Sequence, residues 1–456
     1  MKKYYCIILL ALNIILVATG YAQSNGWMKL FDGKTLHGWK RLAGTATYTV
    51  ENGMIVGHTV LNSGNTFLAT EKEYSDFILE VDIKIESANG NSGIQTRSHY
   101  DAAGRDGKGL VFGRQVEVDP SARKWSGGIY DEGRRNWLYP LTLNTKGQDA
   151  FKLDAFNHYK IECIGNEMKT WVNGIATAFL VDTIDRKGFI ALQVHQVSGP
   201  EEINKKIYFK NILIKTTGLQ PTPLAPGLYV VNFVPNTLTG YEKKNGWQLL
   251  FNGKTSAGWI GAYESTFPAK GWEIRDGIIK VIGSEGKERA GGGDIVTTSQ
   301  YKSFDLSFEF KLTPGANSGV KYFVTLAENS PGPAIGLEYQ VLDDSLHPDA
   351  RMGINGNRTL SSLYDLIPAK KPQTIIRTIG EWNTGRIIVY PGNKVEHYLN
   401  GIKVLEYRRG SPEFRDLVAS SKFKAWKNFG EAEKGHILLQ DHGNEVSYRS
   451  IKIRTL

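Results

Sequence analysis

The sequence predicts an all-β protein made of two tandem β-sandwiches of the jelly-roll type. Glycine is abundant, with 50 residues, and aromatic residues make up 11% of the chain, whereas long runs of helical periodicity are scarce. Short segments of alternating apolar and polar residues, bounded by glycine and asparagine, are typical of strands and tight turns. The chain also repeats its landmarks once, which indicates two domains of the same kind.

The first 22 residues predict a signal peptide and not part of the fold. Lys2 and Lys3 precede an apolar run over 6–17, and the sequence GYA at 20–22 suits signal peptidase. No second apolar run in the sequence is long enough to span a membrane. We therefore expect an exported protein, in the periplasm or at the cell surface. Removal of this segment leaves Cys163 as the single cysteine, which excludes an internal disulfide.

The repeat sets the domain limits. NGWMKLFDGKTLHGW at 25–39 returns as NGWQLLFNGKTSAGW at 245–259, with ten of the fifteen positions identical. NSGIQTR, WVNGI and GFIALQVH return in the same order as NSGVKYF, YLNGI and GHILLQDH. We predict a first domain over 24–217 and a second over 245–456. The segment between them, 218–244, begins with the proline-rich LQPTPLAPG, which predicts a linker.

Within each copy, the strands follow from a period of two. FILEVDIKIE at 77–86 and FDLSFEFKL at 304–312 place apolar side chains on one face and charged side chains on the other. HYKIECIGNEMKTWVNG and RIIVYPGNKVEHYLNG each predict a hairpin, and the VNG and LNG tripeptides at their ends predict further turns. Many short strands with such turns predict a sandwich or jelly roll.

The tripeptide NSG follows a strand in both copies and begins the next one. Turn chemistry alone would explain its Ser and Gly, while Asn91 and Asn317 are candidate substrate-binding residues. Arg97 follows the first bend, where a guanidinium that faces a concave sheet could hold sugar or oxyanion oxygens. Its counterpart is Phe323, with Lys321 two residues earlier.

A row of polar side chains lies on the next strand. Gln115, Glu117 and Asp119 alternate with valines, so all three point to the same face. In the second copy Glu338 and Gln340 share a face, with the acid moved by one strand period. An outward face would make these ordinary amphipathic strands. A concave face would make Glu117, Asp119 and Glu338 candidate catalytic carboxylates.

The segment that follows mixes aromatic and charged residues without a helix or strand period. Aromatic faces stack on sugars, while carboxylates and guanidiniums hold hydroxyl groups, so the mixture predicts a carbohydrate site. The candidate substrate-binding residues are Trp125, Tyr130, Asp131, Glu132, Arg134, Arg135 and Trp137. In the second copy the Tyr-Asp pair survives at Tyr364, but the Glu-Gly-Arg-Arg run does not. The two copies are therefore not chemically equivalent.

Both copies contain Gln-x-His on a late strand, as Gln193 with His195 and as Gln440 with His442. Each histidine is either a hydrogen-bonded structural residue or a functional one. With carboxylates it could bind a divalent metal ion, although the sequence contains neither HExxH nor a cysteine cluster. We expect no organic cofactor.

The formal net charge is +9. The surplus is scattered, without a basic block or an RNA-binding motif. Such a surplus favours solubility, so we do not expect nucleic acid as a partner.

Several motifs together resemble one known family, the 3-keto-disaccharide hydrolase / 3-keto-glucoside 1,2-lyase / 3-keto-2-hydroxyglucal hydratase domain. They are LFDGKTLHGW, NSGIQTR, QVEVDP, SGGIYDE with RRNWL, and LQDHG with Arg449. The resemblance covers nearly all of the chain after the signal peptide, once per copy. It implies concanavalin A-like jelly rolls and an oligosaccharide or glycoside substrate in its 3-keto form. The first copy departs from the family at LQVHQ and the second in the Tyr-Asp loop, which leaves the active copy open.

The resemblance also implies a reaction. A ketone at C3 acidifies the C2 hydrogen, so a carboxylate can remove it, and elimination at C1 then expels the aglycone. We expect Glu117 or Glu338 as the base, and Asp131 or Glu132 as the acid for the leaving oxygen. The candidates for stabilising the enediolate are Arg97, His195 and a bound divalent ion, and His442 is a further candidate catalytic residue.

Two alternatives remain open. A direct glycoside hydrolase would use paired carboxylates, and EVDP resembles the acidic strand of jelly-roll glucanases, but Ala122 occupies the place of the third acid. A non-catalytic carbohydrate-binding protein would use the same sandwich and the same aromatic residues.

Overall fold

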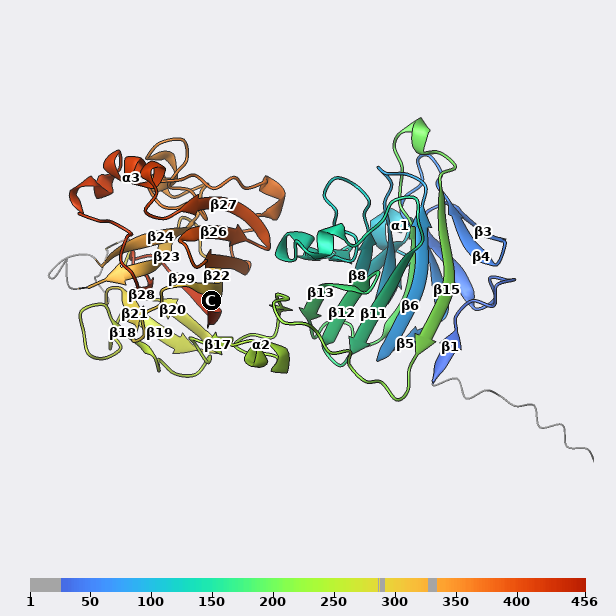
Figure 1. Cartoon of the computed structure of the whole chain (residues 1–456), viewed down its shortest axis with the longest axis horizontal. Helices are drawn as coiled ribbons and strands as arrows, with labels where there is room; N and C mark the ends of the chain where they lie inside the picture. The colour runs from blue at the N-terminus through green and yellow to red at the C-terminus, as the bar shows by residue number, and fades with distance from the viewer. Residues whose placement is uncertain (1–25, 286, 288–291, 327–333) are drawn as a thin grey trace, which may run out of the picture.

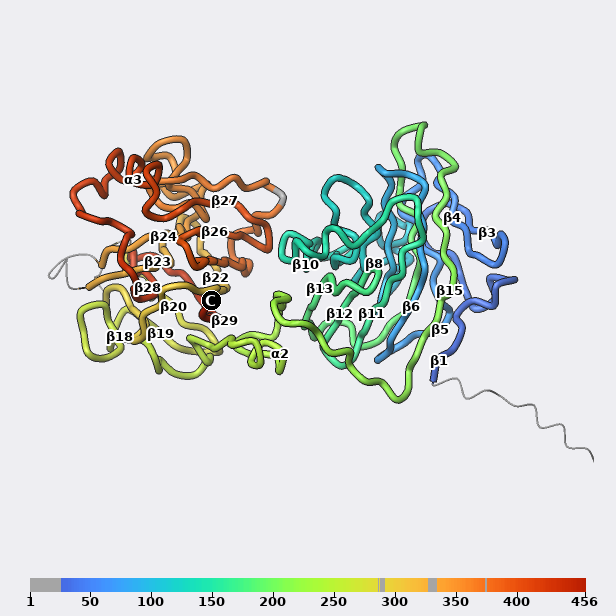
Figure 2. Tube along the Cα trace, in the orientation of Figure 1, coloured from blue at the N-terminus to red at the C-terminus, as the bar shows by residue number. Residues whose placement is uncertain are grey.

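The computed structural model describes residues 26–285, 287, 292–326 and 334–456. Figure 1 shows two β-rich lobes, and the tube in Figure 2 follows the chain from one to the other through a single segment. The predicted signal peptide, residues 1–22, lies outside the described residues. Among the helices of the described residues, none is long and apolar enough to cross a membrane.

Two sheets form the first sandwich. One contains, in spatial order, β16 (Val231–Asn232), β13 (Ile175–Val181), β12 (Glu167–Val172), β11 (Asn157–Ile164), β6 (Phe77–Ile85), β15 (Lys206–Lys215), β4 (Met54–His58) and β3 (Thr47–Glu51), with β1 (Trp27–Lys29) paired to β15. The other contains β10 (Asn136–Tyr139), β9 (Ile129–Glu132), β8 (Leu110–Val118), β7 (Ser92–Asp101), β14 (Gly188–Val194), β5 (Thr66–Tyr74) and β2 (Trp39–Ala43). Consecutive strands from β4 to β7 alternate between the two sheets, as in a jelly roll.

The second sandwich repeats this plan. One sheet contains β19 (Trp272–Arg275), β20 (Ile278–Val281), β29 (Val446–Thr455), β22 (Phe304–Leu312), β25 (Asn383–Val389), β26 (Lys394–Leu399) and β27 (Ile402–Arg408), with β17 (Gln248–Leu249) paired to β29. The other contains β18 (Trp259–Gly261), β21 (Ile295–Thr297), β28 (His436–Leu439), β23 (Asn317–Thr325) and β24 (Ile335–Leu342). The prediction of two tandem all-β jelly-roll sandwiches is confirmed.

Sequence period and turn chemistry account for this architecture. On β6, Val81 and Ile83 are buried, while Glu80 and Asp82 between them are partly exposed, as a half-buried strand requires. The Asn-Gly pairs at 173–174 and 400–401 form the turns between β12 and β13 and between β26 and β27, and all four residues have positive φ. A two-residue hairpin turn needs that conformation, which Asn and Gly adopt most readily.

The segment predicted as a linker contacts both sandwiches. Its strand β16 pairs in parallel with β13 of the first sandwich. Its helix α2 (Gly240–Lys244) begins with a capping box between Thr239 and Glu242. Lys452 of the second sandwich donates to Glu242 Oε1 at 2.6 Å. The other α-helices of the described residues are α1 (Gly104–Gly107) and α3 (Pro412–Ala419).

Candidate functional site

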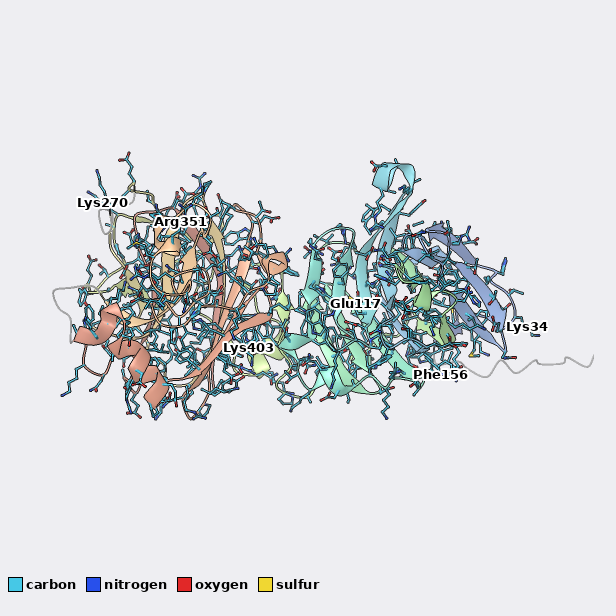
Figure 3. All side chains as sticks on the ribbon, turned by 90° about the horizontal axis from the view of Figure 1, so that it is seen from above. Lys34, Glu117, Phe156, Lys270, Arg351 and Lys403 are labelled. Atoms are coloured by element: carbon cyan, nitrogen blue, oxygen red, sulfur yellow. The ribbon has the colours of Figure 1, made fainter. Side chains whose placement is uncertain are left out.

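Strands β7 and β8 place polar side chains on the outer face of the first sandwich. Ile94 and Val116 belong to the core, and because side chains alternate along a strand, Gln95, Gln115 and Glu117 point the other way. Glu117 is nevertheless only 3% exposed. Figure 3 places it within the body of the first sandwich. The row therefore faces neither the hydrophobic core nor open solvent.

Glu117 lies in a network of hydrogen bonds. Gln115 Nε2 donates to its Oε1 at 2.8 Å, and Asn91 Nδ2 donates to its Oε2 at 3.2 Å. Burial raises the pKa of Glu117 to about 7; these hydrogen bonds oppose the rise, and the carboxylates of Asp119 and Glu132 add to it. A carboxyl group with such a pKa can accept or donate a proton near neutral pH.

Further groups lie around this row. Asn65 Nδ2 donates to Glu132 Oε1 at 3.1 Å, and Arg105 forms an ion pair with the same oxygen at 3.3 Å. His195 Nδ1 lies 2.7 Å from the Gln196 carbonyl oxygen, and burial lowers the pKa of His195. The sequence did not single out Asn65, in a polar loop, or Arg105, in the short helix α1, because neither belongs to a recognisable motif.

Three half-buried aromatic rings contact one another beside the polar row on β8. The Trp125 and Trp137 rings meet edge-on, with centroids 4.5 Å apart, and Tyr130 meets Trp137 at 5.4 Å. The Arg123 guanidinium lies 4.8 Å from the Trp125 ring and pairs with Asp119 at 2.8 Å. The structure therefore brings together the aromatic residues that the sequence predicted as one site.

The side chain of Arg97 does not lie beside Glu117. A bulge in β7 gives it a φ of 48°, and its guanidinium donates to Asp76 and to the carbonyl oxygens of Ser75, Cys163 and Gly165. The expected role of Arg97 on the concave face is not supported by this geometry, because the bulge turns the side chain away from Glu117 and its donors are engaged.

Asp131, Arg134 and Arg135 form a separate ion-pair cluster. Asp131 is fully buried and pairs with Arg134 at 2.7 Å and with Arg135 at 2.5 Å. Arg134 also pairs with Asp185, and Arg135 with Asp182. The cluster is not part of the group around Glu117, because Asp131 lies on the opposite face of β9 from the two residues beside it. The arrangement favours a structural role for these three residues over sugar binding.

The equivalent face of the second sandwich contains a cavity of about 320 Å³. The polar residues that line it are Asn317, Lys321, Glu338, Gln340, Tyr364, Lys422, Gln440 and His442. All except Lys422 belong to motifs that the sequence singled out. Lys422 begins a short 3₁₀ helix, Lys422–Ala425, which follows α3 and has no recognisable motif, so only the folded chain brings it to the cavity.

Glu338 is the buried carboxylate of this cavity. Burial raises its pKa, and the charges of Lys321, Lys422 and His442 oppose that rise. Lys321 Nζ lies 3.9 Å from Asp294 Oδ2. A carboxylate, two ammonium groups and an imidazole therefore act on one another within the same site.

Tyr364 and Lys422 lie together at the cavity. The Tyr364 hydroxyl donates to Asp349 Oδ2 at 2.8 Å, and Lys422 Nζ lies 4.1 Å from the Tyr364 ring. Burial lowers the pKa of Lys422, and the charge of Glu338 opposes this. Three of the buried amide oxygens that lack a hydrogen-bond partner within the described residues belong to this cavity, those of Asn317, Gln340 and Gln440. They are available to a ligand that donates hydrogen bonds.

The strand register relates the two sites residue by residue. Gln95 lies opposite Gln115 in the first sandwich, and Lys321 lies opposite Glu338 at the equivalent place in the second. The first pair is a neutral hydrogen bond of 2.8 Å between amides. The second pair is a cation and an anion.

The carboxylate also occupies a different position along the strand in the second sandwich. Gly93 lies opposite Glu117, and Gly319 lies opposite Gln340, so Gln340 occupies the place of Glu117. Ile295 lies opposite Leu439 in the second sandwich, which puts Asp294 where the first sandwich has Phe67. Strand register alone would have revealed Asp294 as a site residue.

The divalent ion remains a prediction. Among the described residues, no three side chains of the His, Cys, Asp and Glu types lie together as a ligand set for a metal ion.

Outer sheet faces lined with carboxylates, amides and aromatic rings, on two tandem sandwiches, define a protein of the carbohydrate-active class. The chain belongs to the 3-keto-alpha-glucoside-1,2-lyase-like domain family, whose model matches residues 26–215 and 246–454. A "3-keto-disaccharide hydrolase" of Bacteroides thetaiotaomicron is 39% identical over 233 residues, which cover 46% of this chain and 79% of that protein.

Solved structures also resemble parts of the chain. A putative glycosyl hydrolase from Parabacteroides distasonis is 31% identical and covers 49% of this chain and 99% of its own, with a TM-score of 0.42. A second putative glycosyl hydrolase from the same organism is 28% identical and covers 46% of this chain and 100% of its own, with a TM-score of 0.36.

Proposed function

We propose that this protein cleaves the glycosidic bond of 3-keto-glycosides and that the second sandwich performs the reaction. The observation that carries this proposal is the cavity in which Glu338, Lys321, Tyr364, Lys422 and His442 meet. Family membership supports the choice of substrate. The first sandwich has neutral amides where the second has the Lys321–Glu338 pair, which favours the second as the reacting domain.

The geometry suits abstraction of a proton next to a ketone. The Glu338 carboxylate takes the C2 proton, and the electron pair of the broken C–H bond passes to the C3 oxygen as an enediolate. Burial raises the pKa of Glu338 and so increases its basicity. Lys321 supplies the positive charge that stabilises the enediolate.

Departure of the aglycone completes the elimination. The electron pair returns to form the C1–C2 double bond, and the C1–O bond breaks. The leaving oxygen needs a proton, and Lys422 is the candidate donor because burial lowers its pKa. Addition of water to the resulting 2-hydroxyglucal would turn the elimination into a net hydrolysis.

The test compares Glu338→Gln with Glu117→Gln in the full chain, on a 3-keto-glucoside that carries a chromogenic aglycone and deuterium at C2. We expect Glu338→Gln to lower kcat at least about a hundredfold, the usual size of a general-base contribution. Glu117→Gln is the matched control and should stay within about twofold of the wild type. Mass spectrometry of the product identifies the 2-hydroxyglucal or the 3-keto-glucose.

Each remaining outcome has a distinct meaning. Loss of turnover in Glu117→Gln alone would move the reaction to the first sandwich. Product that keeps all of its deuterium would exclude proton abstraction at C2 and favour direct hydrolysis. Cleavage of an unoxidised disaccharide at the same rate would contradict the 3-keto requirement. Loss of turnover with a chelator would add the divalent ion.

A further inference from the structure

The first sandwich keeps a polar outer face but lacks the charged pair of the second at the matching positions. Gln95 and Gln115 replace Lys321 and Glu338, and Phe67 takes the place of Asp294. Amide and aromatic groups bind sugar hydroxyls and ring faces, but they do not abstract protons from carbon. The matching positions therefore keep groups that bind sugars, whereas the lysine that would stabilise an enediolate is replaced by a neutral amide.

Gln193 shows that this face has unused hydrogen-bonding capacity. The residue is fully buried, and within the described part of the chain neither Nε2 nor Oε1 of its amide has a hydrogen-bond partner. On β14 it lies opposite Phe67, on the same outer side as Ala191, which pairs with Gln95. An unpaired buried amide is costly, so a hydroxyl-bearing ligand or the water it orders would relieve this cost.

The neighbouring amides are held in fixed orientations. Gln95 Nε2 donates to Gln115 Oε1 at 2.8 Å, and Gln115 Nε2 donates to Glu117 Oε1 at 2.8 Å. Asn91 holds the other oxygen of Glu117. These hydrogen bonds fix the orientation of each amide and carboxyl group. Glu117 therefore serves here as an oriented acceptor for hydroxyl groups.

An aromatic wall borders this network. Tyr130 lies on the strand next to Gln115, and its ring continues to Trp137 and Trp125 through edge-on contacts. All three rings are half-buried, so part of each remains accessible. Rings in this arrangement can stack on the apolar face of a pyranose while the amides bind its hydroxyls.

We propose that the outer face of the first sandwich is a saccharide-binding site that holds an intact, unoxidised glycan without cleaving it. The ligand class is a neutral oligosaccharide. This site goes beyond the reaction assigned to the second sandwich and does not depend on it.

The experiment measures binding of cellotetraose, maltotetraose and laminaritetraose to the full chain by calorimetry. We expect at least one of the three to bind to the wild type and equally to Glu338→Gln, with no cleavage. Tyr130→Ala should weaken that binding at least about tenfold, whereas Tyr130→Phe, which keeps the ring, should stay within about threefold. Binding of none of the three at millimolar concentration would overturn the proposal.

A second variant, Gln193→Leu, tests the site independently in case Tyr130→Ala does not fold. Gln193→Leu removes the unpaired amide, so we expect an unchanged or raised Tm, binding weakened at least about fivefold, and unchanged turnover of the 3-keto-glucoside. Binding at wild-type strength in both Gln193→Leu and Tyr130→Ala would overturn the proposal. Loss of turnover in Gln193→Leu would also overturn it, because the first sandwich would then take part in catalysis. Turnover that survives in Glu338→Gln would instead contradict the proposed function and leave the binding result intact.

Discussion

Two buried glutamates, Glu117 and Glu338, occupy similar faces in chemically different surroundings. Glu117 is hydrogen-bonded by amides and lies near Asp119 and Glu132, so burial and like charge both raise its pKa. Glu338 has Lys321 nearby, which opposes the effect of burial. Burial thus raises the pKa of both carboxyl groups, but like charges add to the rise at Glu117, whereas positive charges oppose it at Glu338.

The raised pKa of Glu117 makes the stability of the fold depend on pH. Its pKa is about 7 in the folded chain and 4.5 as the ordinary value, so the folded state binds the proton more tightly than the unfolded state. The stabilisation from this proton is complete below pH 4.5 and is lost as the pH rises through 7. Relative to Glu117→Gln, the wild type should lose about 3 kcal/mol of unfolding free energy over that window.

Denaturant unfolding of both proteins between pH 4 and about pH 8.5 checks this difference. Glu71→Gln, at an exposed position of β5, is the control and should follow the wild type across the same window. Parallel curves for the wild type and Glu117→Gln would show that Glu117 does not titrate in the way described.

Sequence period alone could place part of the site. Because Gln115 and Glu117 lie on a regular strand, a period of two correctly put them on one face. It could not place Arg97, since a bulge reverses the expected direction. Nor did composition distinguish Tyr130, which faces the site, from Asp131, which faces the opposite way. Those distinctions depend on where strand β9 begins and on its register with β8.

At the scale of elements, a glycine on β7 or β23 makes room for the side chain of the neighbouring strand. A Cβ atom at Gly93 would lie 2.4 Å from the Gln115 side chain, and a Cβ atom at Gly319 would lie 2.4 Å from Glu338 Oε1. Neither glycine has a positive φ. Close approach, and not backbone freedom, therefore explains why glycine occupies both positions.

Gly319→Ala should displace the Glu338 carboxylate while the fold survives, because a flexible side chain can move aside. We expect kcat to fall at least about tenfold, since small misplacements of a catalytic group are costly, with a Tm within a few degrees of the wild type. Gly93→Ala makes the same change against Gln115 and should leave turnover intact. Steady-state kinetics and thermal unfolding of both variants provide the measurement. Equal loss of turnover in the two variants would contradict the assignment of the reaction to the second sandwich.

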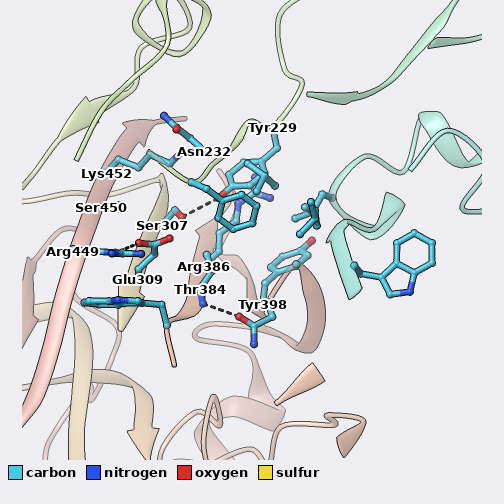
Figure 4. Close-up of a pocket in the computed structure, with 18 of the residues that line it drawn as sticks. Tyr229, Asn232, Ser307, Glu309, Thr384, Arg386, Tyr398, Arg449, Ser450 and Lys452 are labelled. Carbon is cyan, nitrogen blue, oxygen red and sulfur yellow. Dashed lines mark hydrogen bonds and ion pairs between the residues drawn. The ribbon is translucent and has the colours of Figure 1, made fainter. Parts of the chain in front are cut away.

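At the scale of the whole molecule, the linker covers a face that sequence pattern alone would leave in solvent. FDLSFEFKL predicted one charged face, yet Asp305, Ser307 and Glu309 are all buried. A cavity of about 120 Å³ lies here between Trp137 of the first sandwich, the linker and the second sandwich. Figure 4 shows this cavity with Glu309 beside Arg449. The local pattern predicted each sandwich, but it carries no information on which outer face a distant linker covers.

The linker residue Tyr229 contacts this face through both its hydroxyl group and its ring. Its hydroxyl lies 2.9 Å from Ser307 Oγ, its ring lies 3.9 Å from the Arg386 guanidinium, and its carbonyl accepts a hydrogen bond from Tyr139.

Tyr229→Ala removes the buried ring and should lower the free energy of unfolding by about 3–5 kcal/mol. Tyr229→Phe removes one hydrogen bond and should cost about 1 kcal/mol. Because the ring joins the linker to the second sandwich, calorimetry of Tyr229→Ala should also show the two sandwiches unfolding in more widely separated transitions than in Tyr229→Phe. Identical calorimetric profiles for the two variants would mean that the sandwiches do not depend on this contact.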